Sequence, residues 1–329
     1  MSRLLGCAVI GAGRIGALHA STLLSLPNVR LTVVVDPDQE AAVAAAEDRL
    51  AAARLDAALR NPGVDAVVIA SPTALHAEHI IAAARAGKAV FCEKPLALDL
   101  AQAEEAVRAV EETQVPFQVG FQRRYDAGHA AAQIRLQSMG QLEVLRLQSS
   151  GRISPSVERC LGSGGLFRGF ALDDIDLARF HGGDIDEVSV MGACFSDPSS
   201  TSLDDIDTAI ITLRFASGAL GVIHVARQAD RPCEHRAELQ CEHGRLVVER
   251  EQATPLRVYD HDGIHLDCVD TFERYRQAYV DEIAAFVESV REGRTPAPGP
   301  RDALESLRVA LAASRSLREG RPVRLSRRL

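Results

Sequence analysis

The 329-residue sequence lacks several features that mark whole classes of protein. Its longest apolar runs fall far short of the roughly 20 residues that a membrane-spanning helix needs, so no membrane span is predicted. Its net charge is −8, and no basic tract occurs apart from the short segment Arg321 to Arg328, so nucleic acid is not a predicted partner. Met1 is followed almost at once by a predicted strand instead of a signal peptide, and we therefore expect a cytoplasmic protein.

The cysteines form neither a disulfide framework nor a zinc motif. There are seven, an odd number, and no two of them form a C-x-x-C pair. The nearest approach to metal-ligand spacing is Cys241 with His243 and His261 with His265, but no third ligand converges on either pair. We therefore predict no metal site. The cysteines stand at positions 7, 92, 160, 194, 233, 241 and 268.

The length of the chain suits two domains better than one core. In the first third, apolar strands alternate with helices, and continuous apolar runs such as Val64 to Ala70 are typical of a parallel sheet covered on both faces. An alanine-rich helix is expected from Glu40 to Ala53. Residues 1–120 are thus predicted to form an α/β, doubly wound Rossmann domain.

Beyond Gly140 the pattern changes to strands joined by hairpin turns, for example at Ser217-Gly218 and His243-Gly244. A helix is expected near Asp173 to His181, and two more helices close the chain. Residues 121–329 are therefore predicted to form an α+β domain with a large, open, mostly antiparallel sheet. An uncovered apolar sheet face favours self-association.

A glycine-rich motif follows the first predicted strand. The segment Cys7 to Gly16 is an apolar strand that runs into G-x-G-x-x-G at the start of a helix. In such a motif Gly11 makes the tight turn, Gly13 lets the backbone approach a pyrophosphate, and Gly16 lets the helix pack closely on the strand. Backbone N–H groups at the start of that helix hold the phosphates. We therefore predict a dinucleotide site.

Asp36 ends the next apolar run, twenty residues beyond the third glycine. A carboxylate at this place accepts hydrogen bonds from a ribose 2′-OH and repels a 2′-phosphate, which favours NAD over NADP. The segment Asp36-Pro37-Asp38 is also good turn chemistry, so a turn role for Asp36 remains open beside the cofactor role.

Several segments together resemble one protein family over nearly the whole chain. They are GAGRIGALHA (11–20), SPTALHAEHI (71–80), GKAVFCEKPLAL (87–98), GFQRRYD (120–126), SGG-F (163–167), DDIDLAR (173–179) and RYRQAYVDEI (274–283). On these motifs the chain resembles the glucose-fructose oxidoreductase and inositol dehydrogenase (Gfo/Idh/MocA) family, and within it the inositol 2-dehydrogenases. The resemblance implies NAD(P)-dependent oxidation of a ring or sugar hydroxyl, or the reverse reduction, by a homodimer or homotetramer.

The resemblance also implies a set of cofactor-binding residues. Besides the three glycines and Asp36, the implied set comprises Arg14, Ile15, Ser71, Pro72, Thr73, His76, Glu93 and Lys94. For His76, an ordinary place at the start of a helix is an equally open interpretation.

Lys94, in the E-K-P motif, is the implied catalytic residue. In the family this lysine lies by the nicotinamide and the reacting hydroxyl, and the Lys-Pro bond is commonly cis. A lysine beside a cationic nicotinamide releases its proton more readily, so it can exchange a proton with the hydroxyl during hydride transfer. The alternative is a surface lysine in a turn before Pro95, but ligands bind at the end of a parallel strand, which favours catalysis.

The second part of the family's catalytic set is altered. Inositol dehydrogenases carry an Asp and, four residues on, a His; here Gly169 and Asp173 stand at these places. A carboxylate, with an ordinary pKa of about 4, is a weak base at pH 7 and cannot copy an imidazole. Asp173 is still expected to face the pocket as the second catalytic residue, although Asp173, Asp174 and Asp176 also suit a simple role at a helix N-terminus.

The substrate pocket therefore differs from that of an inositol dehydrogenase. Arg152 and Ser154 stand where those enzymes place a His and an Asn, and Arg152 with Arg124 makes an acidic substrate a candidate. Pairing of Arg152 with Asp173 is the alternative. The implied substrate-binding residues are Arg124, Arg152, Ser154, Asp173, Asp176 and Tyr279.

Two classes of function follow. The first is an NAD-dependent dehydrogenase or reductase that acts on a polyol, sugar or modified sugar through Lys94. The second is a catalytically reduced NAD-binding protein that serves as a sensor or in assembly. The intact E-K-P motif favours the first class, and the missing Asp-His pair favours the second.

Overall fold

The computed structural model forms two compact units, Met1–Gln122 with Gln277–Glu305 and Arg123–Arg276 with Ser306–Leu329. It describes residues 3–47, 49–151, 162, 164–195, 205–227, 234–249, 258–260, 263–265 and 271–325. Residues 277–305, which lie in the second of the two domains predicted from the sequence, belong to the first unit. The reason is burial: Ile283 and Phe286 of α11 (Arg276–Glu292) are fully buried in the core of the first sheet, and each such side chain contributes roughly 1.5–3 kcal/mol.

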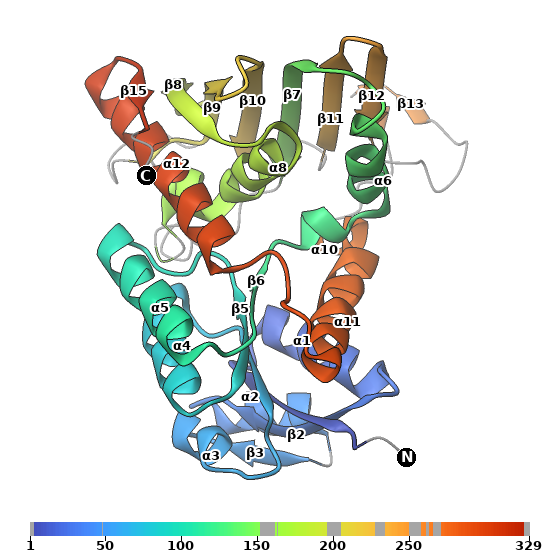
Figure 1. Ribbon diagram of the computed structural model, residues 1–329, viewed down its shortest axis with the longest axis vertical. Helices are drawn as coiled ribbons and strands as arrows, with labels where there is room; N and C mark the ends of the chain where they lie inside the picture. Colours follow the sequence, from blue (N-terminus) through green and yellow to red (C-terminus); the bar gives the residue numbers. More distant parts are fainter. Residues whose placement is uncertain are drawn as a thin grey trace. The chain divides into compact units, whose positions relative to one another are not determined.

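The first unit is built on a six-stranded parallel sheet with the order β3-β2-β1-β4-β5-β6 (Figure 1). The strand order reverses between β1 and β4, which confirms the predicted doubly wound topology. The strands are β1 (Leu5–Ile10), β2 (Val29–Val35), β3 (Leu50–Ala52), β4 (Ala66–Ile69), β5 (Ala89–Glu93) and β6 (Phe117–Gly120).

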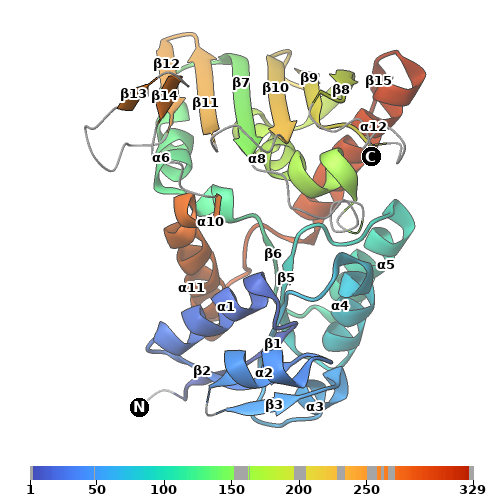
Figure 2. The ribbon, with the colours of Figure 1, turned by 180° about the vertical axis from the view of Figure 1, so that it is seen from behind.

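Helices cover both faces of this sheet. On one face, α1 (Arg14–Ser25), α2 (Gln39–Ala46) and α11 pack on a core of alternate strand residues such as Val9, Val68 and Phe91. Helix α4 (His76–Arg85) packs on β4 and β5, and α5 (Leu100–Thr113) packs on α4 (Figure 2). Two shorter elements of this unit are α3 (Leu55–Leu59) and the 3₁₀ helix η1 (Thr73–Leu75).

The helix predicted from Glu40 to Ala53 is wrong in its second half. Helix α2 ends at Ala46, Glu47 has a positive φ of 52°, and the chain enters β3. Strand β3 pairs with β2, with Leu50 beside Val33. Alanine-rich sequence favours a helix locally, but the backbone hydrogen bonds offered by the edge of the sheet override that preference here.

The second unit contains a seven-stranded sheet with the order β12-β11-β7-β10-β9-β8-β15. Strands β7 and β10 run parallel and the other neighbours are antiparallel, as predicted. The strands are β7 (Leu142–Gly151), β8 (Ile185–Ala193), β9 (Thr208–Phe215), β10 (Leu220–Arg227), β11 (Glu234–Cys241), β12 (Gly244–Val248) and β15 (Val323–Arg324), and β13 (Val258–Asp260) pairs with β14 (Gly263–His265).

Among the described residues, the helices lie on one face of this sheet and none covers the other face. Helix α8 (Leu172–Gly182) packs on β7 and β10, and α6 (Ala127–Leu136) packs on β12 (Figures 1 and 2). The remaining helices are η2 (Gln122–Tyr125), η3 (Leu166–Phe170), α10 (Thr271–Arg274) and α12 (Pro300–Glu319). Among the described residues, no helix combines the length and the apolar character needed to cross a membrane.

Candidate functional site

Three loops of the first unit lie side by side at the carboxyl edge of its sheet. Ile10 at the end of β1 pairs with Ile69 at the end of β4, and Ile69 pairs with Cys92 near the end of β5. The glycine-rich loop, Ser71 and Lys94 follow these strands. The structure therefore gathers the predicted cofactor residues at the point where the strand order reverses, which is where ligands bind in this type of sheet.

The requirement for glycine has a different structural reason at each of the three positions. Gly11 has φ +100°, and a Cβ there would lie 2.5 Å from the carbonyl oxygen of Ala70. A Cβ on Gly16 would lie 1.8 Å from the carbonyl oxygen of Gly11, so only glycine allows α1 to pack this closely. Gly13 is exposed, and a Cβ there would meet nothing within 4 Å. The space above Gly13 thus suits a ligand, and no side chain caps the first turn of α1.

Asp36 lies directly beside the glycine-rich loop. Its Oδ2 accepts a hydrogen bond of 2.7 Å from the Ala12 N–H, and its Oδ1 accepts one of 2.8 Å from the Asp38 N–H. Asp38 in turn caps α2 by accepting from the N–H groups of Glu40 and Ala41. The carboxylate therefore organises a turn and is also held at the edge of the predicted nucleotide site, so the geometry accommodates both roles of Asp36.

The segment after β4 forms one wall of this region. Pro72 leads into η1, and the half-buried Ser71 and Thr73 lie on either side of it. His76 at the start of α4 is buried, and its two ring nitrogens each lie 2.7 Å from a backbone carbonyl oxygen, that of Pro95 for Nδ1 and that of Ser71 for Nε2. Burial lowers the pKa of His76, and the two carbonyl oxygens partly offset that effect.

The E-K-P segment continues from the end of β5. The carboxylate of Glu93 faces the interior, where its Oε1 lies 2.7 Å from Nε2 of the fully buried His19. Lys94 is half-buried, and its peptide bond to Pro95 is cis, as the resemblance implies.

In the second unit, Asp173 lies in the first turn of α8 and is 7% exposed. Arg123 approaches it with Nη2, 3.8 Å from Asp173 Oδ2, and donates from Nη1 to Asp174 Oδ1 at 2.8 Å. Burial raises the pKa of Asp174, and the Arg123 charge opposes that rise. Arg123 therefore supplies positive charge to both carboxylates.

Two predicted substrate-binding residues, Arg124 and Asp176, are joined to each other. Arg124 donates from Nε and Nη2 to the two carboxylate oxygens of Asp176, both at 2.7 Å. Ser306 donates to the same carboxylate at 3.1 Å, and the Arg124 guanidinium lies 5.2 Å from the centre of the Phe180 ring. This bidentate pair orders α8, and a contact of either residue with substrate stays a prediction.

The other predicted pocket residues are Arg152, Ser154 and Tyr279. Arg152 and Ser154 lie outside the described residues, so their predicted roles and the suggested pairing of Arg152 with Asp173 stay predictions. Tyr279 belongs to the first unit, where it is buried on α11 with its ring centre 6.2 Å from that of His19.

Two groups of buried polar residues contain members that the sequence analysis did not single out, namely Ser149, His235, His19 and Glu282. Ser149 on β7 donates to Asp174 Oδ1 at 2.6 Å and lies 3.0 Å from His235 Nδ1. Among the described residues, one group of His, Cys, Asp and Glu has the spacing of metal ligands, namely His19, Glu93 and Glu282. Their only sequence signal is a polar residue within an otherwise apolar helix or strand face.

The sequence matches the models of the two domains of one protein family. Residues 5–121 match the oxidoreductase family with the NAD-binding Rossmann fold (GFO_IDH_MocA), and residues 132–325 match its C-terminal alpha/beta domain. The chain belongs to this oxidoreductase family. This confirms the predicted family.

Its relatives and neighbours have closely related names. The chain is 34% identical to the scyllo-inositol 2-dehydrogenase (NAD(+)) of Bacillus subtilis, with 99% of this chain and 97% of the relative covered. It is 33% identical to the myo-inositol 2-dehydrogenase of Thermotoga maritima, covering 96% and 97%. A crystal structure of a myo-inositol dehydrogenase from Corynebacterium glutamicum superposes with a TM-score of 0.92 at 32% identity, covering 99% and 100%.

This member of the family is an NAD-dependent oxidoreductase. Its own residues fit the cofactor: the uncapped start of α1 suits a pyrophosphate, and the open space at Gly13 admits it. The Asp36 carboxylate beside the loop suits an unphosphorylated ribose. The predicted cofactor NAD and the predicted enzyme class are thereby confirmed.

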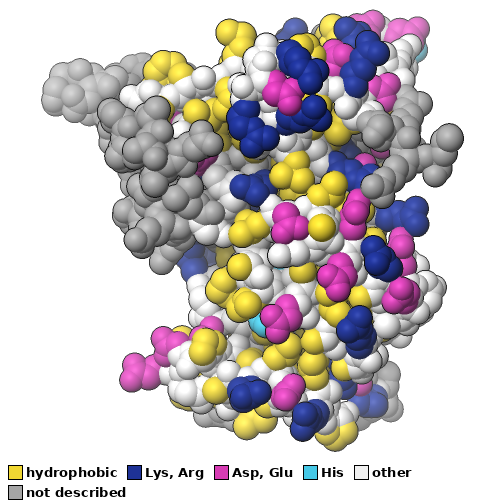
Figure 3. Space-filling model, turned by 90° about the vertical axis from the view of Figure 1, so that its left-hand side faces the viewer, with side chains coloured by type: hydrophobic (Ala, Val, Ile, Leu, Met, Phe, Trp, Pro, Cys, Tyr) yellow, Lys and Arg dark blue, Asp and Glu magenta, His cyan; other side chains and the backbone are white. Residues whose placement is uncertain are grey.

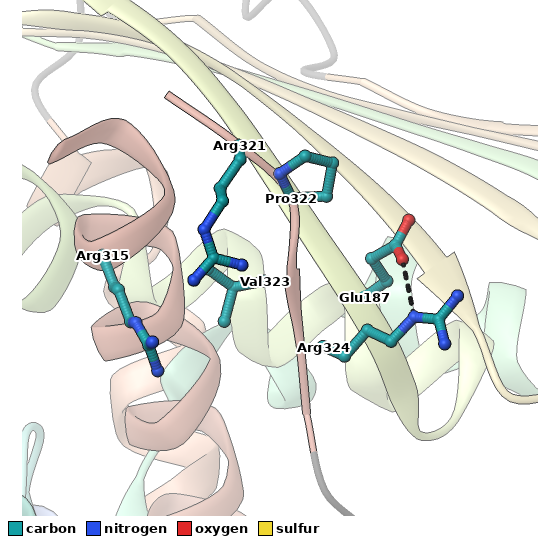
Figure 4. A pocket seen from close by; sticks show the side chains of 6 residues that line it. All are labelled: Glu187, Arg315, Arg321, Pro322, Val323 and Arg324. Carbon is teal, nitrogen blue, oxygen red and sulfur yellow. Dashed lines mark hydrogen bonds and ion pairs between the residues drawn. The ribbon is translucent and has the colours of Figure 1, made fainter. Parts of the chain in front are cut away.

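A separate pocket lies on the second unit, near the end of α12 (Figure 4). Basic and acidic side chains are interspersed on the molecular face in Figure 3, whereas the charged residues that line this pocket are three arginines, Arg315, Arg321 and Arg324, and one glutamate, Glu187. Arg315 pairs with Glu319 at 2.6 Å, and Arg324 pairs with Glu187 at 3.3 Å. Arg321 shares Glu319 with Arg315, so the lining carries a net positive charge. The three arginines are more than half exposed, and solvent weakens their attraction for an anion.

Proposed function

We propose that this oxidoreductase transfers a hydride between NAD and a hydroxyl-bearing carbon of a polyol, sugar or modified sugar, with Lys94 as the residue that exchanges the hydroxyl proton. The observation that carries the proposal is the position of Lys94 at the end of β5, two strands from β1 and its glycine-rich loop. A lysine in the turn after that strand stands where a bound nicotinamide ring and its substrate are expected.

The residues of the first unit divide the work as follows. The backbone of Gly11 to Gly16 binds the pyrophosphate, Asp36 accepts from the ribose, and the Ser71 to Thr73 segment bounds the nicotinamide region. NAD, when bound, supplies the hydride acceptor or donor. Lys94 holds or takes the proton of the reacting hydroxyl at its Nζ.

The relatives are named for inositols, but the substrate here is proposed to differ from myo-inositol. Gly169 and Asp173 replace the Asp and His that the resemblance implies for inositol oxidation, and Arg123 charge-compensates Asp173. Without that relay, a carbonyl or imine to be reduced, or a substrate acid held by Arg152, is favoured over a neutral inositol. We expect myo-inositol to be oxidised very slowly.

The test is Lys94→Met, with NAD-linked rates measured on a panel of inositols, neutral sugars and sugar acids at several pH values. Turnover should fall by about 10² or more, because a positioned acid or base contributes that much, while NADH affinity stays nearly unchanged. Lys88→Met is the matched control. Lys88 is the chain's other lysine, and its Nζ donates to the Val64 carbonyl at 2.7 Å at the opposite edge of the sheet.

Full activity of Lys94→Met would reduce Lys94 to a turn residue. No NAD-linked activity of the unmodified protein on any member of the panel, with tight NADH binding, would favour the catalytically reduced sensor or assembly protein. Brisk oxidation of myo-inositol would show that the changes at Gly169 and Asp173 are harmless.

We further propose that the open face of the second sheet binds a second copy of this chain. The burial pattern of β8, β9 and β10 leaves apolar side chains exposed on it, with Met191 78%, Leu220 48% and Ile210 40% exposed. Beside them, Arg146 and Glu238 form a charged pair at 2.8 Å. Subunit interfaces typically combine an apolar centre with a charged border. In a two-fold dimer, the apolar strip of one copy would pack against the same strip of the second copy.

A further inference from the structure

The residues on both sides of Lys94 are each bound by a buried histidine. Before it, Glu93 Oε1 lies 2.7 Å from Nε2 of His19. After it, the carbonyl oxygen of Pro95 lies 2.7 Å from Nδ1 of His76. His19 is 0% exposed and His76 2%. These are short side-chain contacts in an interior where a polar group needs a partner.

His19 links helix α1 to Glu93, the residue before Lys94. It lies on α1, the helix that begins at the glycine-rich loop. Its ring packs edge-on against Phe91, with ring centres 5.3 Å apart. The Glu93 carboxylate also packs close to Gly120, where a Cβ would lie 3.2 Å from Glu93 Cδ. The contact between His19 and Glu93 therefore joins α1 to the end of β5 with little freedom.

His76 lies between the segments that follow β4 and β5. Its second nitrogen, Nε2, lies 2.7 Å from the carbonyl oxygen of Ser71, so one ring connects the segment after β4 to the segment after β5. A neutral imidazole has a single N–H, so His76 donates to one of the two carbonyl oxygens and holds its other nitrogen against the second; only the protonated ring donates to both. An apolar side chain would fill the same volume but would not contact the carbonyl oxygens of Ser71 and Pro95 through polar atoms.

We propose that His19 and His76 are positioning residues that clamp the Lys94 segment from both sides, and so place its amine relative to NAD. The proposal rests on the proposed role of Lys94. It assigns to α1 a second task besides phosphate binding, because the helix that holds the pyrophosphate also fixes the residue before the lysine. A shift of about 1 Å in a reacting group costs as much as 10²-fold in rate, so the clamp bears directly on turnover.

The test uses the scarcity of lysine, since the chain contains only Lys88 and Lys94. In protein labelled with ¹³C,¹⁵N-lysine, the two side chains give two sets of signals, which Lys88→Arg assigns. NADH should shift the Lys94 signals in the unmodified protein and leave those of Lys88 in place. In His19→Leu and His76→Phe the NADH-induced shift of Lys94 should fall below about half, because the amine is no longer fixed.

Activity on the best panel substrate gives the second measurement. For both histidine variants we expect kcat to fall at least about tenfold, with the Kd for NADH changed less than about threefold. His19→Gln, which keeps an N–H for Glu93, should recover most of the loss. Leu23→Ala and Ile80→Ala are matched controls, because they remove buried side chains from the same two helices without touching the Lys94 segment.

His19→Leu leaves a buried carboxylate without its histidine and could fail to fold, so His19→Leu with Glu93→Met is made as well. If this double variant folds and recovers full kcat, or if folded single variants keep the Lys94 shift and behave like the two controls, the clamp is overturned. Those outcomes leave the proposed function standing as long as Lys94→Met is inactive. An active Lys94→Met variant overturns the proposed function instead.

Discussion

Asp36 organises a local turn, and we expect the same side chain to contact the cofactor. Its carboxylate accepts from Ala12 in the glycine-rich loop and from Asp38 in the following turn. Both donors are neutral N–H groups, so they do not compensate the negative charge of the carboxylate beside the loop. That charge disfavours a second anionic group, the 2′-phosphate of NADP, at the same place.

We therefore expect NAD(H) to bind at least about tenfold more tightly than NADP(H), and Asp36→Ser to shrink that ratio. Titration calorimetry with the two cofactors measures both affinities. Asp38→Ser is the control, since Asp38 caps α2 and should affect stability without changing the cofactor preference. Equal affinities in the unmodified protein would contradict this role of Asp36.

At the scale of the element, the glycines in the turn from β1 into α1 meet two different requirements, close packing of the helix at Gly16 and open space for a ligand at Gly13. Gly16 is required by packing, because any Cβ there would overlap the Gly11 carbonyl. Gly13 has φ −63°, a value open to any residue, and its surroundings are empty. The fold itself therefore has no need of a glycine at position 13, and we expect the close approach of the cofactor to be the reason for it.

Gly16→Ala should consequently affect mainly stability, and Gly13→Ala mainly NADH binding. Gly16→Ala should lower the free energy of unfolding by at least about 2 kcal/mol, because a Cβ is forced against backbone. Gly13→Ala should change it by less than about 1 kcal/mol yet weaken NADH binding at least tenfold. Urea unfolding and NADH fluorescence titration distinguish them. A Gly13→Ala protein with unchanged NADH affinity would argue against pyrophosphate binding over this turn.

At the scale of the whole molecule, the second unit buries three histidines in one polar region. Burial lowers the pKa of His129 to about 4 and that of His181 to about 3, and it holds the pKa of His235 well below the ordinary 6.5. His129 Nδ1 and His181 Nε2 lie 3.2 Å apart, and a charge on either ring opposes a charge on the other. All three are neutral in the folded protein at pH 7.

Folding should therefore weaken as the pH falls from about 6.5 toward 4, because the unfolded chain binds protons that the folded chain refuses. For His129 the loss at pH 5 is on the order of 2 kcal/mol. Asp174, whose pKa burial raises, offsets part of this loss at the acid end of the window. Urea unfolding at pH 7 and pH 5 should show the drop, and His129→Gln should reduce it. A pH-independent stability over this range would contradict neutral buried histidines.

The proposed interface of the second sheet is also a property of the whole molecule. Ile210→Glu places a charge in the middle of the exposed strip and should shift the protein to monomers in sedimentation velocity, since a charge in an apolar interface is costly to desolvate. Ile134→Glu is the control, because Ile134 is 70% exposed on α6, which packs on the sheet's other side. A monomeric unmodified protein would contradict the interface.

Local pattern was enough for the backbone of the cofactor site. Glycines at 11, 13 and 16, the apolar strand before them and the acid after β2 each act through conformation or through neighbours close in the sequence, so their arrangement follows from the order of residues. Local pattern failed at β3, where a helix-favouring sequence was recruited to the edge of the sheet by backbone pairing with β2.

By itself, therefore, the sequence determined the parallel sheet followed by a mostly antiparallel one, the dinucleotide motif and the place of Lys94 after β5. Strand periodicity, glycine conformation and turn chemistry are short-range, so local sequence is enough to predict them. Only the tertiary structure decided which polar side chains meet. His19 and Glu93 are 74 residues apart, and Arg123 and Asp174 are 51 apart. Each pair forms because separate elements pack at one distance and one angle, and that packing depends on the whole core and on no local pattern.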